Sequence, residues 1–170
     1  KNGKDAYQKL VDDGYTDISV FGLSLGGVIA TDIMLNNYVR SYGTFSSPVI
    51  SRLKTNVPEN FWQWYKFKKK KLGESIESVE SRKDEVMGRL DEILTGLNDH
   101  IKSMEAKYAE VELPVFIGQG GKDEMINADI ARQFKDALVK AEVDFHWYEE
   151  APHVITTGRA GKETQKDVLA

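Results

Sequence analysis

Residues 17–27 read Asp-Ile-Ser-Val-Phe-Gly-Leu-Ser-Leu-Gly-Gly, and this stretch decides the fold. Its first half, Asp17–Phe21, is a short run rich in β-branched and aromatic residues, which predicts a strand. Residues 22–26 follow at once as a glycine-flanked turn. Val28–Asn36 is apolar on most sides, which predicts a buried helix. A strand that turns sharply into a buried helix indicates an α/β protein.

The rest of the chain outside residues 51–110 repeats this alternation of strands and helices. The pattern predicts the end of a helix at Asp5–Gly14, strands at Tyr42–Phe45, Leu113–Gly118 and Val143–Tyr148, and a helix at Ala128–Ala141 with Ile130, Phe134, Leu138 and Val139 facing inward. Strands separated by helices of this length predict a parallel sheet built from right-handed βαβ units.

Residues 54–110 differ from their surroundings, because they are dense in charge and contain no convincing strand. A helix is predicted at Asn60–Leu72. A second helical stretch carries an apolar stripe, with expected breaks at Gly88 and Gly96: Ile76, Val79, Val86, Leu90, Ile93, Leu97, Ile101, Met104 and Tyr108. An isolated coiled coil is the alternative. The α/β flanks favour a helical insertion at 51–110 packed on a core formed by residues 1–50 and 111–170.

The composition of the chain argues against several classes of function. The chain has 170 residues and a net charge of -4, so it lacks the basic footprint of a nucleic-acid-binding protein. With no cysteine, it has no disulfide, thiolate metal site or cysteine nucleophile, and we expect a cytoplasmic location. The most apolar stretch, Ile18–Leu35, is interrupted by Ser24, Asp32 and three glycines, which favours a buried strand and helix over a membrane span.

The turn at residues 22–26 matches the G-x-S-x-G nucleophile elbow, in which a strand turns directly into a helix. The serine then occupies a strained backbone conformation at the apex. We expect Gly22 and Gly26 to be glycines because side chains there would clash. A plain glycine-rich turn is the alternative, but the predicted strand before the motif and helix after it favour the elbow, with Ser24 as nucleophile.

A serine hydroxyl needs a base to take its proton, and the chain has three histidines. His100 lies in a charged helical segment and is expected to face solvent, whereas His146 lies within a strand and is expected to be structural. His153 follows a strand end in a loop, a placement suited to a catalytic site. His153 is therefore the predicted base.

The base needs an acid to hold its tautomer, and Asp123 follows a predicted strand in a loop. Glu124 and Asp129 are rival candidates, and a loop aspartate can also simply cap a helix. The chain order Ser24, Asp123, His153 is the order nucleophile, acid, histidine of the α/β-hydrolase sheet, which favours Asp123. Each of the three should lie at the carboxyl edge of a different strand, where ligands bind in such sheets.

Three blocks of sequence carry a family resemblance: Gly22–Gly27, Gly121–Asn127 and Trp147–Thr156. With them the chain resembles the α/β-hydrolases, and more narrowly the small bacterial carboxylesterases and monoacylglycerol lipases. The resemblance implies a mostly parallel sheet flanked by helices, with residues 51–110 as a small helical cap. In that family several strands precede the elbow, so about two βα units, roughly 60 to 80 residues, are expected to be missing before Lys1.

The function implied by the resemblance is ester hydrolysis through an acyl-enzyme on Ser24, with His153 as base and Asp123 as its partner. The Leu25 backbone N–H would form one half of the oxyanion hole, and the second donor would lie in the missing segment. Expected substrates are short- or medium-chain acyl esters or monoacylglycerol, and no metal or cofactor is required. A thioesterase or lysophospholipase is the near rival. An inactive hydrolase-fold fragment is the alternative of a different class.

The aromatic half of the Asn60–Leu72 helix is a candidate acyl-chain site, formed by Phe61, Trp62, Trp64, Tyr65 and Phe67. These rings can equally pack the insertion onto the core. Lys66 and Lys68–Lys71 follow, and a solvated helix face is favoured over attraction to anionic lipid. The expected partner is a small ester, with no nucleic acid and no membrane contact.

Overall fold

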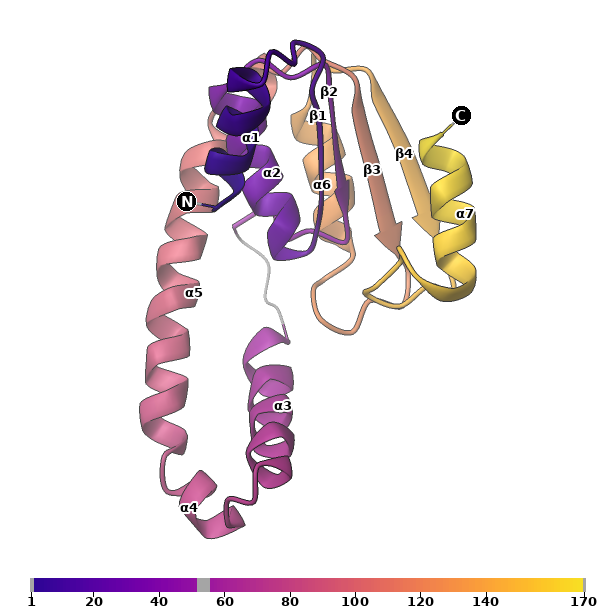
Figure 1. The fold of residues 1–170 in the computed structure, drawn as a ribbon. Helices are drawn as coiled ribbons and strands as arrows, with labels where there is room; N and C mark the ends of the chain where they lie inside the picture. The colour runs from indigo at the N-terminus through magenta and orange to yellow at the C-terminus, as the bar shows by residue number, and fades with distance from the viewer. Residues whose placement is uncertain (1, 52–55, 170) are drawn as a thin grey trace.

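The computed structural model describes residues 2–51 and 56–169, and it contains one parallel sheet with strands in the order β1-β2-β3-β4 (Figure 1). The start of the predicted insertion, residues 52–55, lies outside the described residues. The strands are β1 (Ser19–Leu23), β2 (Ser41–Phe45), β3 (Val115–Gly120) and β4 (Val143–Tyr148). The helices are α1 (Asn2–Asp12), α2 (Leu25–Asn36), α3 (Val57–Lys71), α4 (Ile76–Glu80), α5 (Lys83–Glu105), the short 3-10 turn η1 (Tyr108–Glu110), α6 (Asp129–Ala137) and α7 (Gly158–Val168). The parallel sheet flanked by helices that the sequence predicts is confirmed.

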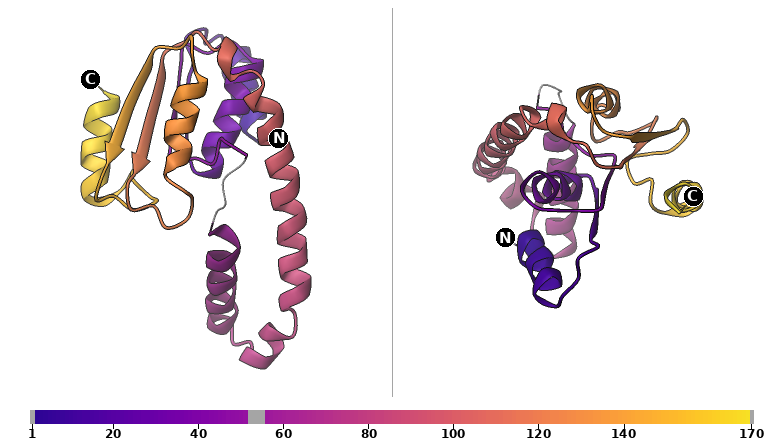
Figure 2. Two further views of the ribbon diagram at one scale, coloured as in Figure 1. Left: turned by 180° about the vertical axis from the view of Figure 1, so that it is seen from behind. Right: turned by 90° about the horizontal axis from the view of Figure 1, so that it is seen from above.

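Alternate residues of the strands serve the two faces of the sheet, as a pleated strand requires. In β3, which is buried throughout, Val115 and Ile117 belong to one apolar cluster and Phe116 to another. Helices α2 and α6 cover the first face, and α7 covers the second beside β4 (Figure 2). Burial on both faces explains why β3 reads as a continuous apolar run rather than an alternating one.

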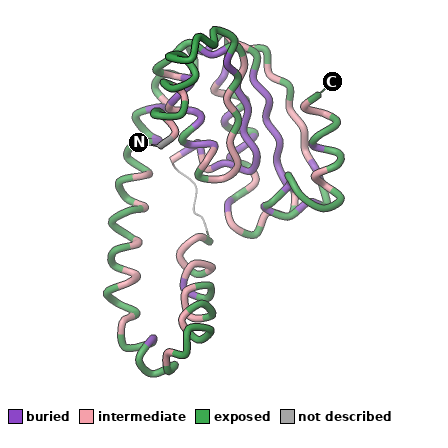
Figure 3. The backbone as a smooth tube through the Cα atoms, in the orientation of Figure 1, coloured by how far each residue is buried: buried purple, intermediate pink, exposed green. Residues whose placement is uncertain are grey.

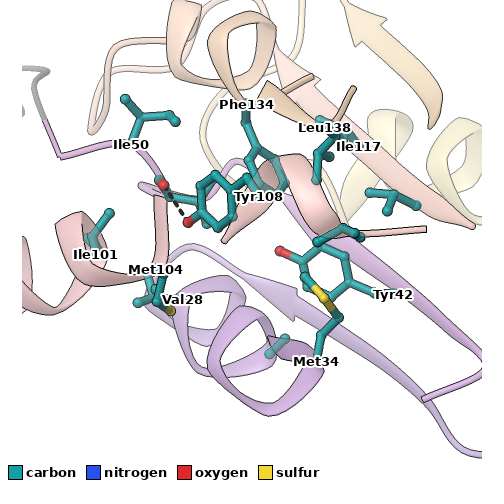
Figure 4. Packing of buried hydrophobic residues seen from close by; sticks show 14 of the residues in the cluster. Val28, Met34, Tyr42, Ile50, Ile101, Met104, Tyr108, Ile117, Phe134 and Leu138 are labelled. Carbon is teal, nitrogen blue, oxygen red and sulfur yellow. Dashed lines mark hydrogen bonds between the residues drawn. The ribbon is translucent and has the colours of Figure 1, made fainter. Parts of the chain in front are cut away.

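The larger cluster joins the first face of the sheet to its helices (Figure 4). Phe134 of α6 lies edge-on to Tyr42 and Tyr108, with ring centroids 6.3 and 4.9 Å apart. The buried Tyr108 hydroxyl donates to the carbonyl of Val49 at 2.8 Å, which satisfies its polar end. This contact ties the segment that enters the helical insertion to the one that leaves it.

Helices α3, α4 and α5 extend away from the carboxyl ends of the strands (Figure 1). Only the end of α5 reaches the core, where Ile101 and Met104 are buried, and most of the helix is exposed or half-buried (Figure 3). The predicted apolar stripe is thus covered only in part, since Ile93 is 67% exposed.

The predicted breaks at Gly88 and Gly96 are wrong, because α5 runs through both glycines and begins only at Lys83. A glycine inside a helix costs roughly 1 kcal/mol relative to alanine but removes no backbone hydrogen bond. The break lies before Lys83, between α4 and α5. The far end of the predicted 128–141 helix is also wrong: α6 ends at Ala137, so Val139 falls outside the helical repeat and is 72% exposed rather than inward.

Candidate active site

Three polar side chains meet at the carboxyl edge of the sheet. Ser24 directly follows β1, Asp123 lies in the loop after β3, and His153 lies in the loop after β4. The Ser24 Oγ is 2.9 Å from His153 Nε2, and His153 Nδ1 is 2.8 Å from Asp123 Oδ2. An imidazole that donates its Nδ1–H to the carboxylate leaves Nε2 to accept the serine proton. The structure therefore brings together the three residues predicted from chain order.

Ser24 stands at a strained apex between β1 and α2, with φ 54° and ψ −125°. A Cβ at Gly22 would lie 2.2 Å from the Gly26 carbonyl oxygen, so only glycine fits there. The expected clash at Gly26 is wrong, because a Cβ at that position meets nothing within 4 Å. The crowding falls one residue later, at Gly27, where a Cβ would lie 1.9 Å from Ser47 Oγ.

Ser24 also occupies the N-cap position of α2, where a serine side chain ordinarily accepts a hydrogen bond from the first turn of the helix. Ser24 makes no such bond. Its hydroxyl contacts His153 instead. Because the first N–H groups of a helix have no intrahelical partner, the Leu25 N–H beside it is positioned to donate to an anion.

The Asp123 side chain is fully buried and accepts hydrogen bonds at both of its oxygens. Its Oδ1 accepts from the backbone N–H groups of Met125 and Ile126 at 2.9 and 3.0 Å, and His153 Nδ1 approaches both oxygens. Burial raises the pKa of Asp123, but the bonds from His153 and the two backbone groups outweigh burial and hold the pKa below its ordinary value. The carboxylate is thus kept ionised beside the imidazole.

The hydrogen bonds of the His153 ring go to Asp123 and Ser24 and not to the rival carboxylates. Glu124 accepts a hydrogen bond from the His153 backbone N–H at 3.2 Å, so it braces the histidine loop rather than the imidazole. The Glu124 carbonyl in turn accepts from Asn56 and from Asn60 of α3. Asp129 is the first residue of α6 and lies near Arg132.

Two adjacent glycines allow the loops after β3 and β4 to lie against each other. A Cβ at Gly120 would lie 2.3 Å from the Pro152 carbonyl oxygen, and one at Gly121 would lie 2.6 Å from the Glu149 carbonyl oxygen. The Lys122 N–H donates to the Ala151 carbonyl at 3.0 Å. This close packing of the two loops places His153 beside Asp123.

The other two histidines lie outside this group. His146 of β4 stacks between Phe116 and Tyr148. It also lies 2.8 Å from Asp144. The half-exposed His100 of α5 lies 3.5 Å from Asp32.

The aromatic residues of α3 divide by exposure. Trp62 is buried, whereas Trp64 and Phe67 are each 54% exposed. Phe61 and Tyr65 are half-buried and stack at 6.1 Å. Lysines of the same helix lie over these rings, for example Lys68 over Trp64 at 5.7 Å. Trp62 therefore packs the helical segment, while Trp64 keeps an accessible face.

Gln119 is the residue that the sequence analysis missed. It is fully buried in β3, and its Nε2 donates to Asp123 Oδ2 at 3.1 Å. The available signal was a lone amide in a strand of otherwise apolar residues and glycines, four positions before the predicted acid.

Two features are absent from residues 2–51 and 56–169. No group of three or more histidine, aspartate or glutamate side chains there has the spacing of a metal site. No helix in the same ranges has the length and apolar character needed to cross a lipid bilayer.

Comparison with known proteins identifies the family of this chain. The profile of the family described as "Serine aminopeptidase, S33" matches residues 4–159. A carboxylesterase of Bacillus subtilis (strain 168) is 27% identical over 168 residues, which cover 99% of this chain and 68% of the relative.

Solved structures agree on the fold. The monoacylglycerol lipase of Paleococcus ferrophilus superposes with a TM-score of 0.67 at 14% identity, covering 99% of this chain and 72% of that one. An esterase from Exiguobacterium antarcticum gives 0.63 at 15% identity, covering 98% and 71%. The profile matches most of the length of this chain, and the sheet has the topology described above. The chain therefore belongs to the serine aminopeptidase S33 family of α/β-hydrolases.

Proposed function

We propose that this protein is a serine hydrolase that cleaves carboxylic esters through an acyl-enzyme on Ser24. One observation carries the proposal: an unbroken hydrogen-bonded path runs from Ser24 through His153 to the buried Asp123. The strained backbone of Ser24 and its unused capping position support the same role, since both present the hydroxyl to the imidazole.

In the proposed reaction, His153 Nε2 takes the Ser24 proton as Oγ attacks the ester carbonyl carbon. Asp123 stabilises the imidazolium that forms and holds its orientation. The carbonyl oxygen becomes an oxyanion, for which the Leu25 N–H at the start of α2 is the donor on this chain. His153 then gives the proton to the leaving alcohol. Water, activated by the same histidine, releases the acid and restores Ser24.

The substrate class rests on the comparisons. The Bacillus relative is a carboxylesterase, and one structural neighbour is a monoacylglycerol lipase. We therefore assign short- or medium-chain acyl esters, including monoacylglycerols, as substrates. A thioester or lysophospholipid would react by the same steps, as would an activated peptide, so the assay must compare leaving groups.

The test is replacement of Ser24 by alanine, measured with p-nitrophenyl butyrate, butyryl thioester and an aminoacyl p-nitroanilide. Ser24→Ala should lower kcat on the ester by at least about 10³-fold, because removing a triad member removes the whole unit. Ser103→Ala, an exposed serine on α5, is the matched control and should retain full activity. A fluorophosphonate probe should add one mass increment to the wild type and none to Ser24→Ala.

Near-normal turnover by Ser24→Ala would contradict the assignment. A wild-type protein that neither hydrolyses the ester nor takes up the probe would favour the inactive hydrolase-fold alternative.

We also propose that α3 contributes to the acyl-chain site through Phe61, Trp64 and Tyr65, whereas Trp62, the fourth residue predicted there, is buried and packs the helical segment. The α3 segment is joined to the loop of Asp123 by the Asn56 and Asn60 contacts with Glu124, which supports its placement beside the site. Trp64→Ala should reduce kcat/KM on decanoyl esters more than on acetyl esters, because contacts far from the carbonyl act on the tail. Trp62→Ala should instead lower the melting temperature, since Trp62 is 5% exposed. Equal losses on every chain length would assign Trp64 a structural role only.

A further inference from the structure

Gln119 stands out in β3 because it is an amide with no exposed surface in a strand buried on both faces. Buried polar side chains require hydrogen-bond partners, so each atom of this amide can be accounted for. Its nitrogen carries two N–H donors and its oxygen is an acceptor.

The two donors of Gln119 have two acceptors. Nε2 lies 3.0 Å from the Gly120 carbonyl oxygen and 3.1 Å from Asp123 Oδ2. The first contact fixes the amide against its own strand. The second contact holds the oxygen of Asp123 that lies nearest to His153, at 2.8 Å from Nδ1.

The Asp123 carboxylate is therefore fixed from both sides. Met125 and Ile126 hold Oδ1 through their backbone N–H groups, while Gln119 holds Oδ2. Without Gln119, the imidazole would be the one remaining hydrogen-bond partner of Oδ2 among the described residues, and Oδ2 would be held less firmly than Oδ1. The orientation of His153 toward Ser24 depends on that carboxylate.

The oxygen of Gln119 is in a different position from its nitrogen. Within the part of the chain that the structure describes, Oε1 is buried and accepts no hydrogen bond. An unsatisfied buried carbonyl destabilises a fold, and an apolar side chain of the same shape would avoid that penalty. The amide is thus poorly explained by packing and well explained by what its nitrogen does for Asp123.

We propose that Gln119 is a positioning residue for the reaction: its amide N–H fixes Asp123 Oδ2 and thereby holds His153 in line with Ser24. This inference rests on the proposed function of the Ser24, His153 and Asp123 group.

The first experiment replaces Gln119 by methionine, which keeps the length of the side chain and removes the donor. On p-nitrophenyl butyrate, kcat should fall by about 10- to 100-fold, as for loss of one hydrogen bond to a charged group, with KM unchanged. KM should not change because Gln119 is fully buried and contacts Asp123, so it has no exposed surface to offer an ester. The melting temperature should stay within about 3 °C of the wild type, because the unpaired Oε1 is removed together with the donor.

Gln133→Met is the matched control. Gln133 of α6 also donates its Nε2 to an aspartate, Asp129, at 3.3 Å, but on the exposed surface. The same chemical change made there should leave kcat and KM at wild-type values.

The second experiment replaces Gln119 by glutamate and separates positioning from packing. An ionised carboxylate beside Asp123 repels it, whereas the protonated acid can donate its O–H to Oδ2 as the amide does. The ratio of kcat in Gln119→Glu to kcat in the wild type should therefore rise by at least about fivefold from pH 8.5 to pH 6. A packing defect would leave that ratio constant.

A Gln119→Met variant with kcat within twofold of the wild type would overturn the proposal, as would a pH-independent ratio for Gln119→Glu. If Gln119→Met fails to fold, the Gln119→Glu ratio decides alone. Ser24→Ala separates failure of the proposed function from failure of the positioning role. If Ser24→Ala is inactive while the Gln119 variants have normal activity, the proposed function stands and the positioning role is wrong. If Ser24→Ala is active, the proposed function itself fails.

Discussion

Asp123 and Glu124 are adjacent carboxylates with different neighbours, so they should respond differently to loss of charge. Asp123→Asn cannot hold the imidazole in the tautomer that accepts the serine proton, and kcat should fall by about 10³- to 10⁴-fold. Glu124→Gln keeps an oxygen able to accept from the His153 N–H, and its kcat should stay within about threefold of the wild type. Both are measured on p-nitrophenyl butyrate. The reverse ranking would make Glu124 the acid.

At the scale of single residues, chain order and the positions of strand ends were sufficient to predict which three side chains meet. Ser24, Asp123 and His153 each follow a strand, and parallel strands bring their carboxyl ends to one edge. Gln119 could not be assigned in this way, because whether an amide in a strand faces a carboxylate depends on how the next loop turns back. The prediction of a clash at Gly26 failed for the same reason. The crowding lies at Gly27 instead and comes from Ser47, which is distant in sequence.

At the scale of elements, α5 contains two glycines that no tertiary contact requires. A Cβ at Gly88 or Gly96 meets nothing within 4 Å, and both residues are exposed in mid-helix. Gly88→Ala and Gly96→Ala should therefore each stabilise the protein by about 0.5–1 kcal/mol, because alanine loses less backbone entropy in a helix.

The measurement is urea unfolding monitored by circular dichroism, with Gly120→Ala as the contrasting variant. A Cβ at Gly120 would lie 2.3 Å from a backbone carbonyl oxygen, so that substitution should lower stability and activity together. Destabilisation by the α5 substitutions would indicate that α5 has a contact requiring glycine there.

Helix and strand positions were largely predictable, whereas helix ends were less so. The strand at Val143–Tyr148 was predicted at its observed bounds because its apolar residues alternate. The end of α6 and the junction before α5 depend on backbone conformations at Leu138 and Arg82, which side-chain periodicity does not report.

At the scale of the whole molecule, the ionisation of Asp123 makes the stability of the fold depend on pH in the acid range. Its pKa in the folded chain lies below the ordinary value of 3.8, so the ionised carboxylate stabilises the fold. That contribution is complete above the ordinary pKa and is lost as pH falls through the lowered folded pKa. Asp123→Asn should be less stable than the wild type at pH 7, and the deficit should shrink below about pH 4.

Urea titrations of both proteins at pH 7, 5, 4 and 3 give this difference directly. Other carboxylates with a lowered pKa, such as Glu74, contribute to both proteins and cancel. A deficit that is the same at every pH would show that the ionisation of Asp123 is not coupled to folding.

The path from Ser24 to His153 spans 129 residues of sequence for one contact of 2.9 Å. The two side chains meet only once β4 lies in the sheet, so in the proposed mechanism Ser24 gains its base only when β4 has joined the other strands. During synthesis, which adds about 5–20 residues per second, Ser24 would leave the ribosome several seconds before its partner. Arrested nascent chains of increasing length can be treated with a fluorophosphonate. The shortest chain on which Ser24 is labelled would then show how much of the chain must be made before the sheet assembles. In the proposed mechanism, a chain without β4 therefore has a serine hydroxyl that lacks its activating base.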